Sequence, residues 1–185
     1  RMAPAEIDAL MQFFGSDLGQ RIVGLEVSAR RALLDPGVEE AAEAAAAELE
    51  ASGDPRFALL RDFVEANELV EMNVVGALNS NFAFYLGLDA GGAFDGEMSE
   101  AQMLADVWGQ EREIRDETVD WVYSYLGMAY RPLSDDEIGE YVALSLTPEG
   151  RALNAALFTA FDELFTRISR ELGLAAAQFM AGEDI

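Results

Sequence analysis

Four carboxylates are spaced for one face of a helix near the middle of the chain. They are Glu113, Asp116, Glu117 and Asp120. The separations of three, four and seven residues place side chains together on an α-helix, and clustered carboxylate oxygens are the ligands of hard cations such as Ca²⁺ and Mg²⁺. Arg112 and Arg115 lie among them, so a solvated, charge-balanced surface is the simpler interpretation. We therefore expect no metal site here.

The residue types that are absent exclude much other chemistry. The chain contains no His and no Cys, and because its basic residues are all Arg it contains no Lys. Thiol nucleophiles, His-ligated zinc or haem, Ser-His-Asp catalysis and lysine Schiff bases are thereby excluded. We expect no catalytic residue and no cofactor, and a metal-dependent hydrolase that uses carboxylates alone is the enzymatic alternative that remains.

A second group of candidate residues lies in the most apolar segment, 69–88. Asn73, Ser80 and Phe84 fall on one side of this helix, and its opposite side is apolar. Because the helix is apolar nearly all round, we expect it to be buried on both sides. One interpretation is a close helix contact in which the amide bonds to a neighbour. The other is the floor of a mostly apolar pocket, with Asn73, Ser80 and Phe84 as ligand-binding residues.

Composition describes an acidic chain with enough apolar content for a core. Its 185 residues are 51% hydrophobic and carry a net charge of -23, which predicts a single domain over residues 1–185. Such a surface repels nucleic acid and anionic lipid and favours cationic partners or divalent ions. No segment has the uncharged apolar length of a membrane span.

Capping signals predict where most helices begin. Asp35-Pro36, Asp54-Pro55, Ser99, Ser134 and Thr147 each precede a helical pattern. We expect the helix after Ser99 to continue to about residue 125. No segment alternates apolar and polar residues as a strand does, so the predicted fold is an all-α antiparallel multi-helix bundle.

The last helix has the cleanest apolar stripe, of the kind that faces a core. Its members are Leu153, Leu157, Ala160, Phe161, Leu164, Ile168 and Leu172. We expect Gly173 to interrupt this helix, because glycine is a poor helix former. Elsewhere, Glu26 with Arg30 and Glu111 with Arg115 have the i,i+4 spacing of helix-surface ion pairs. Glu26 also borders an apolar stripe, a position that allows partial burial but indicates no catalytic role.

One pattern occurs twice, at an offset of 131 residues. Each copy is a short helix, a break, a Ser or Thr cap (Ser16, Thr147) and a second helix with glycine in its first turn (Gly19, Gly150). The identities between the copies are few, so the internal repeat is weak. The agreement in caps and apolar phase predicts two related helical hairpins, at about 4–34 and 134–172. For Gly19 and Gly150 we expect a close helix contact or an exposed amide.

Residues 6–21 read Glu-Ile-Asp-Ala-Leu-Met-Gln-Phe-Phe-Gly-Ser-Asp-Leu-Gly-Gln-Arg. This segment resembles the bacterial family called domain of unknown function 2059. Its motif has an acidic helix start, an aromatic pair, a Ser, and Gly followed by a polar and a basic residue. A Lys often stands in the family at the position of Arg21. The resemblance covers roughly the first thirty residues. It implies an all-helical, exported protein of the periplasm or the exterior, and it implies no activity.

Together these features predict a non-enzymatic module that binds a protein partner or a ligand. The first alternative is a carrier of an apolar small molecule in a cavity between helices, and the second is the carboxylate-only hydrolase. The partner is accordingly a protein or an apolar small molecule, with no nucleic acid and no membrane span. The sequence leaves the oligomeric state open.

Overall fold

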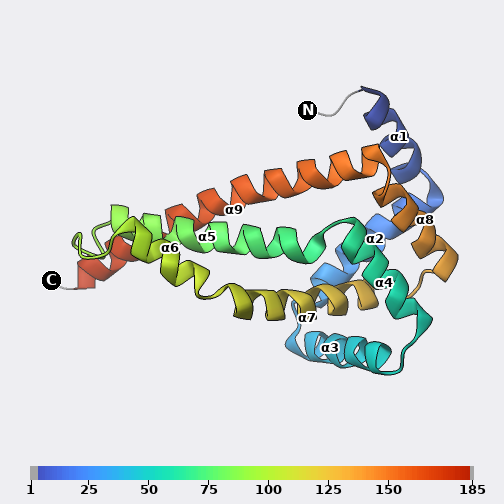
Figure 1. Cartoon of the computed structure of the whole chain (residues 1–185), viewed down its shortest axis with the longest axis horizontal. Coiled ribbons are helices and arrows are strands. Elements are labelled where there is room, and N and C mark those ends of the chain that lie inside the picture. The colour runs from blue at the N-terminus through green and yellow to red at the C-terminus, as the bar shows by residue number, and fades with distance from the viewer. Residues whose placement is uncertain (1–3, 184–185) are drawn as a thin grey trace. The chain divides into compact units, whose positions relative to one another are not determined.

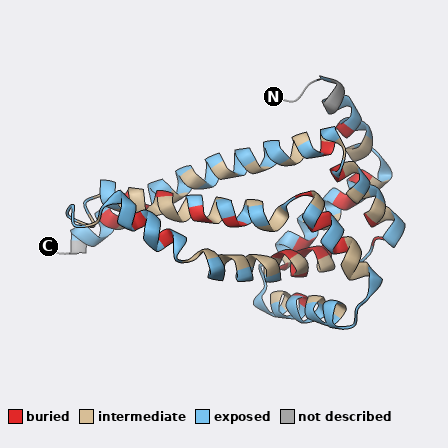
Figure 2. Cartoon of the chain, in the orientation of Figure 1, coloured by how far each residue is buried: buried red, intermediate tan, exposed pale blue. Residues whose placement is uncertain are grey.

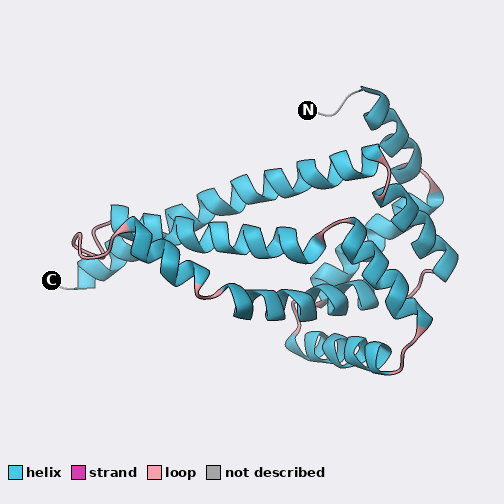
Figure 3. Cartoon of the chain, viewed as in Figure 1, coloured by secondary structure: helices cyan, strands magenta, loops and turns pink. Residues whose placement is uncertain are grey.

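In the computed structural model, which describes residues 4–183, all regular secondary structure is helical. The described part holds nine helices and no strand (Figures 1 and 3). They are α1 (Pro4–Phe14), α2 (Asp17–Ala32), α3 (Pro36–Ala51), α4 (Pro55–Ala66), α5 (Leu69–Ala90), α6 (Glu100–Trp108), α7 (Glu111–Ala129), α8 (Asp135–Ser145) and α9 (Pro148–Glu183). The predicted all-α multi-helix bundle is confirmed.

The helices group into two compact units. Unit 1 comprises residues up to 70 and 118–156, and unit 2 comprises 71–117 and residues from 157 onward. Helices α5, α7 and α9 each contribute residues to both units. The single domain over residues 1–185 stays a prediction.

Unit 1 has one continuous hydrophobic core built from α2, α4, α7 and α8. Its largest fully buried side chains include Ile22, Leu60, Leu126, Tyr130 and Ile138. The caps that begin these helices are the predicted ones: Ser16 accepts from the Gly19 amide, and Ser134 forms a capping box. Satisfying the free amides of a first turn in this way fixes where each helix starts.

Unit 2 is held together by a close contact of α5 with α9. Gly87 on α5, Gly91 directly after its last residue and Gly173 on α9 lie where a Cβ would collide with the facing helix. Val74, Leu78, Met103 and Val107 supply the remaining buried apolar side chains, with Ala83 and Ala177. Small residues at a helix contact let the two backbones approach closely, so this contact rests on backbone proximity more than on large side chains.

Two sequence expectations about helix continuity are wrong. The helix after Ser99 does not reach residue 125, because α6 ends at Trp108 and α7 begins at Glu111. Gly109 caps the C-terminal end of α6, and its backbone N–H donates a hydrogen bond to the Ala105 carbonyl. Conversely, α9 runs unbroken through Gly173, since that glycine is required by the contact with α5 and the intact helix around it keeps its hydrogen bonds.

The apolar stripe of α9 does not face a core, contrary to the expectation from its periodicity. Leu157, Phe161, Leu164, Ile168 and Leu172 are 39–60% exposed, and Figure 2 shows this length of α9 mostly as exposed. The helix instead places Gly173 and Ala177 against α5. Periodicity defined the stripe correctly, but the small-residue face is the one that packs.

The two copies of the repeated pattern have the same hydrogen bonds at the break. The Ser16 hydroxyl donates to the Phe13 carbonyl and accepts from the Gly19 amide. Thr147 does the same with Leu144 and Gly150. Gly19 and Gly150 both press against the carbonyl of the residue six positions earlier, so the expected close contact is confirmed. The common origin of the two hairpins stays a prediction.

None of the helices within residues 4–183 combines the length and the apolar character that crossing a membrane requires.

Candidate functional site

Unit 1 contains a groove of about 710 Å³ between α3, α4 and α7. The residues that line it are Glu43, Ala44, Ala46, Ala47, Glu50, Phe57, Arg61, Val70, Val119, Asp120, Tyr123 and Ser124. Alanines form the α3 side, and their short side chains leave space that larger residues would fill. The volume lies within the range of small-molecule sites, about 300–1,000 Å³.

An aromatic pair lines the groove on the side of α4 and α7. Phe57 and Tyr123 stack with ring centroids 5.0 Å apart and planes 26° from parallel. Burial raises the pKa of the Tyr123 hydroxyl, and Glu65 raises it further. Tyr123 is therefore a neutral side chain with an electron-rich ring face, a surface that attracts organic cations.

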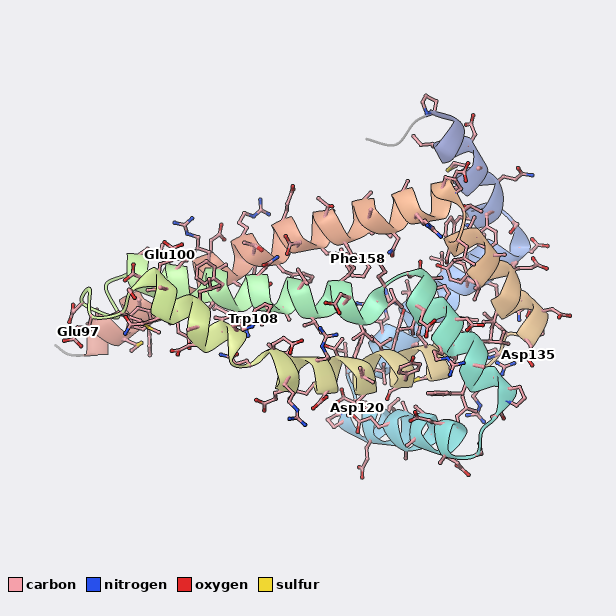
Figure 4. All side chains as sticks on the ribbon, viewed as in Figure 1. Glu97, Glu100, Trp108, Asp120, Asp135 and Phe158 are labelled. Atoms are coloured by element: carbon pink, nitrogen blue, oxygen red, sulfur yellow. The ribbon has the colours of Figure 1, made fainter. Side chains whose placement is uncertain are left out.

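Carboxylates outnumber cations around this groove. Glu43, Glu50 and Asp120 are exposed and line it, with Arg61 as the one cation among its lining residues. Arg61 also lies 3.9 Å from Glu65, which offsets part of its charge. Figure 4 labels Asp120 on α7 beside α3. The groove therefore presents an apolar interior with a negative margin.

The groove holds no nucleophile with an activating base. Ser124 is the serine among its lining residues. The Ser124 hydroxyl donates to the backbone carbonyl of Asp120, in the same helix, at 2.6 Å. The chain offers no His, Cys or Lys. This groove was not predicted from the sequence. The feature of the sequence that relates to it is the alanine run of α3, whose short side chains leave the space open.

A second polar cluster lies in the core of unit 1, around Glu26. The Tyr130 hydroxyl donates to Glu26 Oε1 at 2.7 Å, and the Tyr125 hydroxyl donates to the Glu26 carbonyl at 3.3 Å. Burial raises the pKa of the Glu26 carboxyl, while hydrogen bonds from Tyr130 and Tyr141 and the charge of Arg30 oppose the rise. Glu26 is half-buried beside the apolar stripe of α2, and the Tyr130 hydrogen bond adds to the expected electrostatic pairing with Arg30.

Arg30 makes its principal contacts with aromatic rings. Its guanidinium carbon lies 5.5 Å from the Trp121 ring centroid and 5.2 Å from that of Tyr125. The two rings stack with planes 6° apart. Arg30 thus closes the cluster with a cation-π contact, and the arrangement serves to hold α2 against α7.

The predicted ligand-binding residues lie on α5, in unit 2. Asn73 is exposed, whereas Ser80 and Phe84 are half-buried. The expected burial of α5 on both sides is wrong at Asn73 and at Val75, which is 44% exposed, because unit 2 has few helices with which to cover α5. The Phe84 carbonyl lies against Gly173 of α9. Ligand binding by Asn73, Ser80 and Phe84 stays a prediction.

The carboxylates that open the sequence argument are all exposed on α7. Arg115 forms the expected pair with Glu111 at 2.7 Å and also bonds Glu71 at 2.8 Å. Across the part of the chain that the structure describes, no group of three or more acidic residues is placed to share a metal ion.

Comparison with known proteins adds a family match at the N-terminus. No curated protein and no solved structure matches the chain. Residues 1–48 match the model of a family described as uncharacterized protein conserved in bacteria, domain of unknown function 2059. The resemblance carried by residues 6–21 is thereby confirmed: the N-terminal part of this chain, from α1 through most of α3, is similar to that bacterial family.

Proposed function

We propose that this protein is a non-enzymatic binding module that holds an organic cation in the groove between α3, α4 and α7. The observation that carries the proposal is the stacked pair of Phe57 and Tyr123 inside a groove with a negative margin. An aromatic face attracts a cationic group, most strongly where water is displaced. The ligand class is an ammonium or guanidinium group on an apolar body.

Charge supports a cation over the neutral apolar cargo of a lipid carrier. A purely apolar ligand gains nothing from Glu43, Glu50 and Asp120, which would keep their water. The net charge of -23 also raises the local concentration of cations around the whole chain. A binding role is favoured over a hydrolase because the lining residues include no activated nucleophile.

Isothermal titration calorimetry with three ligands that share a benzyl group and differ in charge tests this function. Benzyltrimethylammonium represents the cation, benzyl alcohol the neutral body and phenylacetate the anion. We expect saturable binding of the cation alone. Tyr123→Leu should weaken that binding about tenfold or more, in line with a cation-π contribution of about 0.5–2 kcal/mol together with lost packing.

Tyr85→Leu is the matched control. Tyr85 stacks on Phe94 at 6.1 Å in unit 2, so its loss removes an aromatic pair of the same kind outside the groove. Equal binding of all three ligands, or equal loss in both variants, would rule the proposal out.

The proposal also includes a location outside the cytoplasm, in the periplasm or the exterior. Its support is the similarity of residues 1–48 to the bacterial family, which implies an exported protein. Fractionation of bacteria that produce the natural protein checks this, and recovery only with cytoplasmic markers would contradict it.

A further inference from the structure

The exposed stripe of α9 is an apolar surface made of seven side chains on one face of the helix. It consists of Leu157, Phe161, Leu164, Ile168, Leu172, Ala175 and Phe179. The six larger side chains are 39–68% exposed, and Ala175 is exposed as well. At about 100° per residue the seven lie within about 80° of one another around the helix. Apolar side chains gathered in this way mark an interaction surface.

The spacing of the stripe is the same read in either direction. From Leu157 to Phe179 the intervals are four, three, four, four, three and four residues, with Ile168 at the centre. An antiparallel copy of the same helix therefore matches it at every position. Ile168 meets its own copy, and Leu164 meets the second copy's Leu172. Phe161 meets the second copy's Ala175, which sets a large side chain against a small one as interdigitating packing requires.

Charge also suits a second copy of this chain. Residues 157–182 carry three acidic and two basic side chains, a net of -1 in a chain of -23. Arg167 and Glu171 lie on the same flank of the stripe. A twofold axis through Ile168 places each Arg167 within about 3 Å, along the helix axis, of the second copy's Glu171. Two ion pairs then border the apolar contact.

We propose that α9 pairs with α9 of a second copy, antiparallel and about a twofold axis at Ile168, so that the protein is a homodimer. Such a contact runs over 22 residue intervals, or about 33 Å. It is isologous, since the same surface is used on both copies, and it closes on itself without leading to a filament. The proposed dimer contact uses residues of unit 2 alone, so it is independent of the proposed ligand binding in the groove of unit 1.

Single cysteines test the register, because the natural chain has none. A disulfide needs Cα atoms about 4.4–6.8 Å apart. Ile168→Cys should therefore form a covalent dimer under mild oxidation. Leu157→Cys, whose two copies would lie about 33 Å apart, should not crosslink with itself but should crosslink with Phe179→Cys. Self-crosslinking of Leu157→Cys as efficient as that of Ile168→Cys would overturn the proposal.

Sedimentation equilibrium of the full chain tests the association itself. Ile168→Glu, which sets two carboxylates face to face at the axis, should raise the dimer dissociation constant about 100-fold or more. Leu34→Glu is the matched control, since Leu34 is 83% exposed in unit 1. Arg167→Glu should weaken the dimer, and adding Glu171→Arg should restore it. A natural chain that stays monomeric at about 100 μM, or an equal effect of the control, contradicts the proposal.

Discussion

Gly87 of α5 and Gly173 of α9 are reciprocal contacts. A Cβ on Gly87 would collide with the Arg170 carbonyl, and a Cβ on Gly173 would collide with the Phe84 carbonyl. The Leu174 amide nitrogen would lie 2.9 Å from the first and the Leu88 amide nitrogen 3.0 Å from the second. Each helix therefore presents a glycine where the other presents backbone, and this pairing is what turns the apolar stripe of α9 away from α5.

Alanine at either glycine should destabilise unit 2. Gly87→Ala and Gly173→Ala should each lower the free energy of unfolding by about 1–3 kcal/mol, because the added methyl forces the two backbones apart. Gly76→Ala on the same helix α5, where a Cβ meets nothing within 4 Å, should instead raise it by about 0.5–1 kcal/mol. Urea unfolding of the three variants measures this, and the account fails if all three shift in the same direction.

The helix starts could be predicted from the sequence because caps are local. The side chains of Asp35, Asp54 and Ser99 each accept hydrogen bonds from backbone N–H groups in the first turn of a helix. These are the helix starts that the sequence predicts. A cap depends on a few neighbouring residues. The break between α6 and α7 is not predictable in this way, because strong helix formers (Gln110, Glu111 and Arg112) follow Gly109. A glycine alone does not decide between a break and a close contact.

The face that α9 buries could not be predicted. The pattern from Leu157 to Leu172 correctly identified side chains on one side of a helix. Which side is buried depends on the partner helix, and Gly87 on α5 and Gly91 directly after it are the residues that meet α9. The groove was missed for a related reason, since Phe57 and Tyr123 are 66 residues apart in the chain and meet through the tertiary fold alone.

The two glycines of the repeated pattern should behave alike. Gly19→Ala and Gly150→Ala each add a methyl against a carbonyl, of Phe13 and of Leu144. Both should lower the free energy of unfolding, by about 1–3 kcal/mol.

Helix glycines with open space around them are the controls for this pair. At Gly24 and Gly139 a Cβ meets nothing within 4 Å, so alanine there should stabilise by about 0.5–1 kcal/mol. Thermal unfolding compares the four variants. A destabilised Gly19 variant beside an unaffected Gly150 variant would show that the two breaks are not equivalent.

Glu26 should make stability fall as the pH rises. Its pKa is raised in the folded protein, so folding favours the protonated carboxyl, and the stability it contributes is fully present below the unfolded value of about 4.3. That contribution is lost as the pH rises through the folded pKa. Glu26→Gln, which keeps an acceptor for Tyr130, should therefore be more stable than the natural chain at pH 7, with the difference vanishing at low pH.

Glu137 provides a control of opposite sign. Hydrogen bonds from Ser134 and Arg21 lower the pKa of its carboxyl, and Arg21 binds it through two bonds of 2.7 and 2.9 Å. Its stabilisation is present above the unfolded pKa and is lost as the pH falls through the folded one. Glu137→Gln should thus be less stable than the natural chain at pH 7. Unfolding free energies at pH 3–7 that change in parallel for both variants would refute the assignment.

The negative margin of the groove is the most direct point at which to test the proposed function. The variant that combines Glu43→Gln, Glu50→Gln and Asp120→Asn keeps the shape of all three side chains and removes their charge. The measurement is its dissociation constant for benzyltrimethylammonium by calorimetry at fixed ionic strength. We predict binding at least about tenfold weaker than in the natural chain, since each lost charge removes attraction to the cation. An unchanged dissociation constant would contradict the account.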